Sequence, residues 1–200
     1  RPPMPHTESA LIELLGAPTA KPRLLVVDDQ PINIKVMNQI FAADHQVFMA
    51  TSGIQALAFC RAHPPDLVLL DIVMPAMDGF EVCAALKADA DTRDIPVIFV
   101  TAHTETAQET RGLELGAVDF ITKPVNPAVV RARVKTQLTL KFQSDLMRKL
   151  VFLDGLTGVF NRRYFDQQLV IETARSVRGQ SHLALIMLDV DFFKRLNDRY

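Results

Sequence analysis

Short apolar runs alternate with amphipathic stretches along most of this chain, beginning at Arg23. Such runs are typical of buried parallel strands, and the stretches between them repeat at the spacing of a helix. The predicted strands are 23–27, 46–50, 66–70, 96–101 and 118–121. The predicted helices are 32–43, 53–62, 79–88, 105–115 and one that begins at 127. Five strand–helix pairs predict an α/β fold with a doubly wound, five-stranded parallel sheet.

Polar side chains follow four of the predicted strands. They are Asp28, Asp29, Asp71, Thr101 and Lys123. Because parallel strands end at the same edge of a sheet, we expect these side chains to gather there, where α/β proteins bind their ligands. From Leu67 to Leu70 the third strand contains only apolar residues, so we expect it to be central and covered on both faces.

Three carboxylates at one edge repel one another unless a cation neutralises them or one takes a proton. Oxygen ligands suit Mg²⁺, the usual cation where phosphoryl groups are handled. Asp71 ends the most buried strand and is the natural nucleophile toward phosphorus, whereas Asp28 and Asp29 are the natural metal ligands. Lys123 and Thr101 add a positive charge and a hydroxyl donor that can stabilise phosphoryl oxygens.

The helix that begins at 127 is unusually long. Apolar residues recur every four positions from Val134 to Leu150, and neither Gly nor Pro occurs between Ala128 and Asp154. The pattern predicts a helix over 127–153. Two interpretations are open: an ordinary long amphipathic helix, or a stalk that pairs with a copy of itself. The spacing drifts from a heptad and favours the first.

Two segments flank this region. Residues 1–22 are rich in Pro and small residues and are interpreted as an N-terminal tail. After the long helix, the sequence Asp154-Gly155-Leu156-Thr157-Gly158 predicts a turn, Asn161 is a plausible helix N-cap, and 183–188 is a strand candidate that ends at Asp189. One helix and one strand do not make a complete domain, so 154–200 is interpreted as part of one.

Composition narrows the functional classes. The formal net charge of −1 gives no bias toward nucleic acid or anionic membranes, and no apolar run approaches a membrane span of about 20 residues. Cys60 and Cys83 both fall in helical apolar patterns, which favours reduced core thiols and a cytoplasmic location.

Four motifs occur in order between residues 23 and 140. They are Asp28-Asp29, Asp71-Ile72-Val73-Met74-Pro75-Ala76-Met77-Asp78-Gly79, Val100-Thr101-Ala102 and Lys123-Pro124. This region resembles the receiver domain of two-component response regulators, which has a flavodoxin-like fold. The resemblance implies phosphorylation by a sensor histidine kinase or a small phosphodonor.

The same resemblance assigns roles to individual residues. It makes Asp71 the phosphoacceptor, and it makes Asp28, Asp29, Asp71 and the backbone carbonyl of Val73 the Mg²⁺ ligands. Thr101, Ala102 and Lys123 contact the phosphoryl group, and Phe120 occupies the position of the aromatic switch. The Lys123–Pro124 bond is expected to be cis. Val73 and His103 lie where the family controls the hydrolytic water, and the apolar Val73 predicts a long-lived phosphoryl group.

The last part of the chain resembles the opening of the GGDEF domain of diguanylate cyclases. The motifs are Asp154 to Arg163, Leu188-Asp189-Val190-Asp191-Phe192-Phe193-Lys194, and Asn197-Asp198. That family condenses two GTP into cyclic di-GMP across a two-fold interface. The resemblance makes Asp189 and the Val190 carbonyl Mg²⁺ ligands and Asn197 a guanine contact. The backbone near Phe192 and Phe193 would cradle the GTP phosphates.

The expected protein is therefore a response regulator whose phosphorylation promotes a homodimer and whose output is a diguanylate cyclase. The Gly-Gly-Asp/Glu-Glu-Phe hairpin does not occur in these 200 residues, so they are expected not to make cyclic di-GMP by themselves. One alternative is a receiver with a degenerate GGDEF-like module that docks partners or senses GTP. A second is a transcription factor, suggested only by the basic residues of the long helix, which better fit a solvated face.

Overall fold

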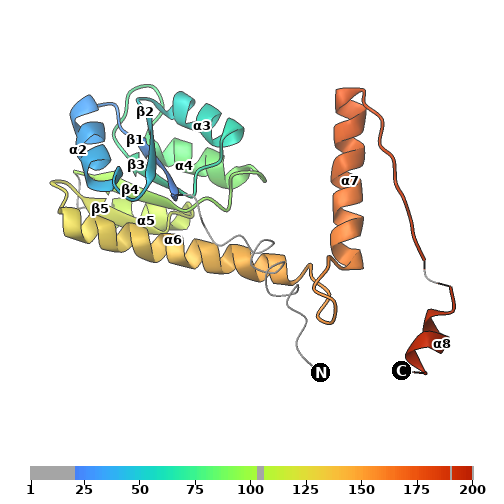
Figure 1. Ribbon diagram of the computed structural model, residues 1–200. Coiled ribbons are helices and arrows are strands. Elements are labelled where there is room, and N and C mark those ends of the chain that lie inside the picture. The colour runs from blue at the N-terminus through green and yellow to red at the C-terminus, as the bar shows by residue number, and fades with distance from the viewer. Residues whose placement is uncertain (1–20, 103–105, 190, 200) are drawn as a thin grey trace. The chain divides into compact units, whose positions relative to one another are not determined.

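The computed structural model describes residues 21–102, 106–189 and 191–199, and the chain forms two compact units, Arg1–Lys149 and Leu150–Tyr200 (Figure 1). The first unit contains one sheet of five parallel strands in the order β2-β1-β3-β4-β5. The strands are β1 (Arg23–Val27), β2 (Gln46–Ala50), β3 (Leu67–Asp71), β4 (Val97–Thr101) and β5 (Asp119–Thr122). The predicted doubly wound parallel sheet is confirmed. Strand β3 is central and buried along its whole length, as its apolar sequence predicts.

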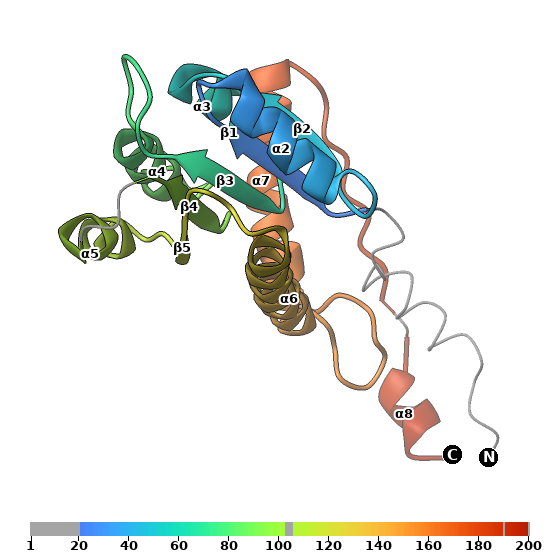
Figure 2. The ribbon, with the colours of Figure 1, turned by 90° about the vertical axis from the view of Figure 1, so that its left-hand side faces the viewer.

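Helices cover both faces of the sheet. On one face, α2 (Pro31–Phe41) and α6 (Pro127–Leu150) pack through Met37, Phe41, Val130 and Val134 against alternate strand residues such as Leu69. The other face is covered by α3 (Gly53–Ala62), α4 (Gly79–Ala88) and α5 (Thr106–Glu114). Figure 2 shows α5 and α6 on opposite sides of β5. The result is a three-layer core in which the sheet is the buried middle layer.

The register of the strands aligns their carboxyl ends. Val27 of β1 lies beside Leu70 of β3, and Asp71 lies beside Val100 of β4. Thr101 lies beside Thr122 at the ends of β4 and β5. The residues that directly follow these strands therefore emerge at one edge, at the point between β1 and β3 where the strand order reverses.

Helix α6 ends at Leu150, three residues before the predicted end at 153. The Leu153 amide donates to the Leu150 carbonyl at 3.2 Å, and Leu153 then forms an antiparallel bridge with Phe160. This reversal of the chain explains the earlier end. Within the first unit, Arg148 near the end of α6 forms a two-pronged ion pair with Asp94 in the loop before β4.

The second unit begins with the predicted turn. The Asp154 carboxylate accepts hydrogen bonds from the Leu156 amide at 3.2 Å and the Thr157 amide at 2.9 Å. The Thr157 hydroxyl also donates to this carboxylate, at 2.7 Å, and this hydrogen bond, followed by the two from the amides, lowers the pKa of Asp154. Helix α7 (Arg162–Gly179) follows, and the predicted Asn161 cap is confirmed, since its side chain accepts from the Tyr164 amide. Helix α8 (Phe193–Asn197) closes the described part of this unit.

The strand predicted at 183–188 is not formed. This segment is without regular structure, and its apolar side chains are exposed, with Leu188 at 93%. A strand requires a hydrogen-bonded neighbour, and in the described residues of the second unit no other segment forms a strand that could pair with it. In the described part of the chain, no helix combines the length and the apolar character needed to cross a membrane.

Candidate functional site

Three carboxylates meet at the carboxyl edge of the sheet. Asp28, Asp29 and Asp71 each present an oxygen, and these oxygens lie within 4.8 Å of one another. Asp28 and Asp71 are buried, at 4% and 5% exposure, and Asp29 is half-buried. The structure thus brings together the three acids that follow β1 and end β3. Buried carboxylates at this separation need a positive partner to remain ionised.

Lys123 supplies one such partner. It follows β5, and its amide donates to the Thr101 carbonyl at 2.8 Å. Its Nζ lies 2.8 Å from Asp28 Oδ2 and 3.0 Å from Asp71 Oδ2, so one ammonium bridges two buried carboxylates. Burial alone would lower the pKa of Lys123, but its hydrogen bonds to Asp28 and Asp71 outweigh burial and raise it. The following peptide bond to Pro124 is cis, as predicted.

Asp28 is held in place from α2. Its Oδ1 accepts hydrogen bonds from the Gln30 amide at 2.8 Å and from Asn33 Nδ2 at 3.0 Å. Sequence reasoning did not identify Asn33 as a positioning residue. The available signal was its place in the first turn of the helix that directly follows Asp28 and Asp29. With Lys123 on Oδ2, both oxygens of Asp28 are oriented.

Asp71 combines burial with a single close cation. Burial raises the pKa of its carboxyl, and Lys123 opposes that shift without cancelling it. Its Oδ1 accepts from the Ile72 amide at 2.9 Å. The loop that follows is pinned by Gly79, whose amide donates to the Ile72 carbonyl at 2.8 Å. A Cβ at Gly79 would lie 2.2 Å from the Asp71 carbonyl oxygen, so only glycine permits this approach. Asp78 and Glu81 form the capping box that starts α4 there.

Asp29, the third acid, is not held among the described residues by hydrogen bonds and an ion pair as Asp28 and Asp71 are. Asp29 Oδ1 is buried and accepts no hydrogen bond from any described residue. Asp29 also has no ion pair with Lys123 within the described residues, since that ammonium contacts Asp28 and Asp71. A buried, unpartnered carboxylate oxygen is costly unless a cation binds it. The three-carboxylate donor set therefore fits a hard divalent cation such as Mg²⁺.

The other predicted receiver residues surround these acids. Thr101 ends β4 and is 1% exposed, and Ala102 follows it at the surface. Phe120 in β5 is half-buried, with its ring 5.1 Å from that of Phe99. Gly112 of α5 provides room for the Phe120 ring, because a Cβ there would lie 2.3 Å from it. The predicted aromatic switch thus packs between the sheet and α5.

Of the two positions predicted to control the hydrolytic water, Val73 and His103, the structure describes Val73. Val73 lies two residues beyond Asp71 in the chain, and its apolar side chain is 59% exposed. Its carbonyl belongs to the loop that Gly79 pins. His103 lies outside the described residues.

Among the described residues, those predicted for the second site form no cluster of potential metal ligands like that of the acidic edge. Asp189 and Phe193 are exposed, and Phe192 is 73% exposed with a positive φ of 58°. Asn197 ends α8, and Val190 lies outside the described residues. Among the described residues, Asp189 belongs to no group of three potential metal ligands. The unpaired segment before Asp189 explains this, because no sheet positions its end.

The fold and the acidic edge define the first unit as a doubly wound α/β protein whose site lies at the switch point between β1 and β3. Residues 24–135 match the family model described as the response regulator receiver domain, and this match covers more than half of the chain. The chain belongs to that family. Residues 151–200 match the model described as the diguanylate cyclase GGDEF domain, so the receiver is followed by part of a GGDEF domain.

Curated relatives match over about three fifths of the chain. One named "Probable cyclic di-GMP phosphodiesterase", from Vibrio cholerae, is 44% identical over 124 residues, which is 62% of this chain and 28% of the relative. Another named "Response regulator PleD", from Caulobacter vibrioides, is 41% identical over 128 residues, which is 64% of this chain and 28% of the relative. The chain thus spans under a third of the length of these relatives.

Solved structures agree with the fold. The signal receiver domain of a signal transduction histidine kinase from Syntrophus aciditrophicus is 36% identical, with a TM-score of 0.55, and covers 59% of this chain and 90% of its own. A CheY-like response regulator receiver domain protein from Methanospirillum hungatei is 26% identical, with a TM-score of 0.59, and covers 62% of this chain and 99% of its own.

Proposed function

We propose that Asp71 accepts a phosphoryl group from a sensor histidine kinase or a small phosphodonor, and that this reaction controls a diguanylate cyclase output. The observation that carries the proposal is the bridge from one ammonium, Lys123, to two buried carboxylates, Asp28 and Asp71, beside a third acid. Three carboxylates and one ammonium leave the cluster with a net negative charge. It can therefore stabilise a phosphoryl group only after a cation has bound, as in phosphoryl transfer.

The chain's own residues prepare Asp71 for this reaction. An Asp71 oxygen forms the new bond to phosphorus, while the bond between phosphorus and the donor's nitrogen or oxygen breaks and that atom keeps the electron pair. Lys123 already contacts Oδ2 at 3.0 Å, so it is placed to neutralise the phosphoryl oxygens. Thr101 stands at the adjacent strand end and offers a hydroxyl donor to the same group.

Asp28, Asp29, Asp71 and the Val73 carbonyl would hold Mg²⁺ at this edge. When bound, the cation supplies charge stabilisation for the phosphoryl oxygens. Asn33 and Gln30 orient Asp28 for that role through the hydrogen bonds to its Oδ1.

The output is inferred from the second unit. Its match to the GGDEF model supports synthesis of cyclic di-GMP from two GTP by the complete protein, with Asp189 and the Val190 carbonyl as Mg²⁺ ligands. Asn197 would contact guanine, and the backbone at Phe192 and Phe193 would contact the phosphates. Phosphorylation would favour a homodimer that brings two such sites together. The two free, buried cysteines suit a reducing compartment such as the cytoplasm.

The phosphoacceptor is tested by intact-mass measurement after incubation with acetyl phosphate and Mg²⁺. The unmodified chain should gain one phosphoryl group, which EDTA should prevent and hydroxylamine should remove, as expected of an acyl phosphate. Asp71→Asn should gain none, whereas the control Asp91→Asn, which changes an exposed acid of the loop before β4, should behave like the parent. Phosphorylation that persists in Asp71→Asn would contradict the assignment.

The output needs a separate assay on a longer protein that contains these residues. Chromatography of GTP reactions should show cyclic di-GMP, increased by beryllofluoride, and Asp189→Asn should abolish it while leaving phosphorylation of Asp71 intact. If GTP is not converted although Asp71 is phosphorylated, the alternative of a non-catalytic GGDEF-like module is favoured.

A further inference from the structure

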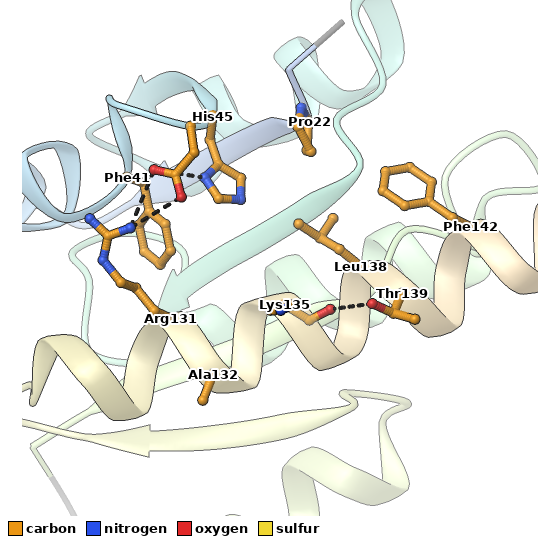
Figure 3. A pocket seen from close by; sticks show the side chains of 10 residues that line it. Pro22, Phe41, His45, Arg131, Ala132, Lys135, Leu138, Thr139 and Phe142 are labelled. Atoms are coloured by element: carbon orange, nitrogen blue, oxygen red, sulfur yellow. Dashed lines mark hydrogen bonds and ion pairs between the residues drawn. The ribbon is translucent and has the colours of Figure 1, made fainter. Parts of the chain in front are cut away.

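A groove of about 410 Å³ lies between α6 and the C-terminal end of α2 (Figure 3). It shares no residue with the acidic edge. Phe41, Leu138 and Phe142 give it an apolar floor, and Figure 3 shows the last two side chains rising from α6 toward the opposite wall. Arg131 and Lys135 add two positive charges from the same helix.

The two cations at the rim of the groove differ in their ion pairing. Arg131 pairs with Asp44 across the groove at 3.2 Å. Lys135 is exposed and forms no ion pair within residues 21–102, 106–189 and 191–199. A groove with this floor and this unpaired cation suits an apolar segment that carries an acid at one side.

The chain itself leads into the groove. Pro22, just before β1, is one of the lining residues (Figure 3). Lys21 is fixed at the rim, since its Nζ donates to the Ala43 carbonyl at 2.7 Å. The 20 residues that precede Lys21 lie outside the described part of the chain, and they connect to it at this groove.

The sequence of that N-terminal segment matches the groove. Leu11, Leu14 and Leu15 follow the i, i+3, i+4 spacing of one helical face, and Glu13 adds an acid beside them. Gly16 follows at once, in the position typical of a helix end.

We propose that the segment Ser9–Leu15 binds in this groove of its own chain, with its leucines on the apolar floor and Glu13 beside Lys135. Five residues lie between Leu15 and Lys21, and the resulting six Cα–Cα steps span up to about 20 Å, enough to return to the groove from its rim. A short tether gives an effective concentration on the order of millimolar. An intrinsic dissociation constant of about 0.1 mM would then keep the groove about 90% occupied.

Paramagnetic relaxation tests this directly in the full chain. Ser9→Cys carries a nitroxide label, which the buried Cys60 and Cys83 should not take up. The methyl signals of Leu138 should lose most of their intensity, whereas those of Leu86, on the other face of the sheet, should not. The double substitution Leu11→Glu and Leu14→Glu should restore the Leu138 signals.

A mixed sample separates the possible occupants. Labelled chain without isotopes is combined with isotope-labelled chain without the nitroxide, and Leu138 should then keep its intensity. Loss of intensity in the mixed sample would show that a second copy supplies the segment, and full intensity in both samples would show that the segment does not bind there. Either result overturns the proposal.

Amide hydrogen exchange gives a second measurement that needs no label. The His45 amide, which donates to the Phe41 carbonyl at 2.9 Å beside the groove, should exchange up to about tenfold faster once the segment is released. Lys135→Glu should produce part of this increase. Lys35→Glu, an exposed lysine of α2 that does not line the groove, is the matched control and should leave exchange unchanged. Equal exchange in both variants would contradict the ion pair with Glu13.

Discussion

Replacing Asp29 with asparagine should stabilise the protein in the absence of divalent cations. The Asp29 carboxylate lies within 4.8 Å of two others, one of its oxygens is buried without a partner, and the ammonium of Lys123 contacts only the other two acids. Asparagine keeps the shape of the side chain but removes its charge. The substitution therefore relieves repulsion without opening a cavity.

The size of the effect follows from the geometry. At the upper limit of 4.8 Å and an effective dielectric constant of about 20, each carboxylate pair repels by about 3.5 kcal/mol. Asp29 is half-buried, so solvent screens part of this repulsion, and the positive charge of Lys123 offsets another part. We expect a net gain of about 1–2 kcal/mol, or an increase of about 4–8 °C in Tm for a domain of this size.

Thermal unfolding in EDTA and in Mg²⁺ provides the assay. In EDTA, Asp29→Asn should melt above the parent protein. In 10 mM Mg²⁺ the parent should gain about 1.4 kcal/mol if its dissociation constant is about 1 mM, and the variant should gain much less. Equal ionic strength from KCl and the exposed Asp91→Asn serve as controls. If Asp29→Asn is no more stable than the parent in EDTA, the account of an unrelieved acidic cluster is wrong.

Three further predictions concern Val73, Gly79 and the two cysteines. Val73→Asn should shorten the lifetime of the phosphoryl group, measured as phosphate release, because an amide can orient water where the exposed valine cannot; an unchanged rate refutes this. Gly79→Ala should lower Tm by about 4–12 °C, because its new Cβ would lie 2.2 Å from backbone and overpacking costs about 1–3 kcal/mol. The control Gly155→Ala, whose Cβ would have no atom within 4 Å, should leave Tm unchanged. Cys60 and Cys83 should resist maleimide at pH 8 until the chain unfolds, because both thiols are buried. Burial also raises the pKa of Cys60 to about 11 and raises that of Cys83. Rapid labelling of the native chain would contradict this.

The acidic edge was predictable because parallel topology converts sequence order into spatial proximity. Once β1, β3 and β5 were recognised as parallel strands, Asp28, Asp71 and Lys123 had to meet at their carboxyl ends, although Asp28 and Lys123 are 95 positions apart in the sequence. No such rule links Arg148 to Asp94, since that ion pair depends on the angle at which α6 crosses the sheet. Hydrogen bonds from side chains such as Asn33 depend on rotamers, which periodicity does not encode.

The segment 183–188 shows the opposite case. Its uninterrupted apolar run is consistent with a buried strand, but the pattern reports only what the side chains prefer to contact. Strand β4 has β3 and β5 as hydrogen-bonded neighbours, whereas this segment has no strand to pair with in the described part of its unit. The motif identifies Asp189, but without a paired strand before it the position of Asp189 could not be predicted.

Helix α6 limits how phosphorylation of Asp71 can reach the GGDEF segment. Its first half is fixed, because Val130, Val134 and Leu138 are buried against the sheet, and moving them would open the core at a cost of several kcal/mol. Its last turns instead expose Met147, and Arg148 holds them by a surface ion pair of about 1 kcal/mol or less. A change at the acidic edge can therefore reposition the last turns far more cheaply than the first half of the helix. The proposed homodimer would then use apolar side chains of those turns, and the ion pair would be the first contact to yield.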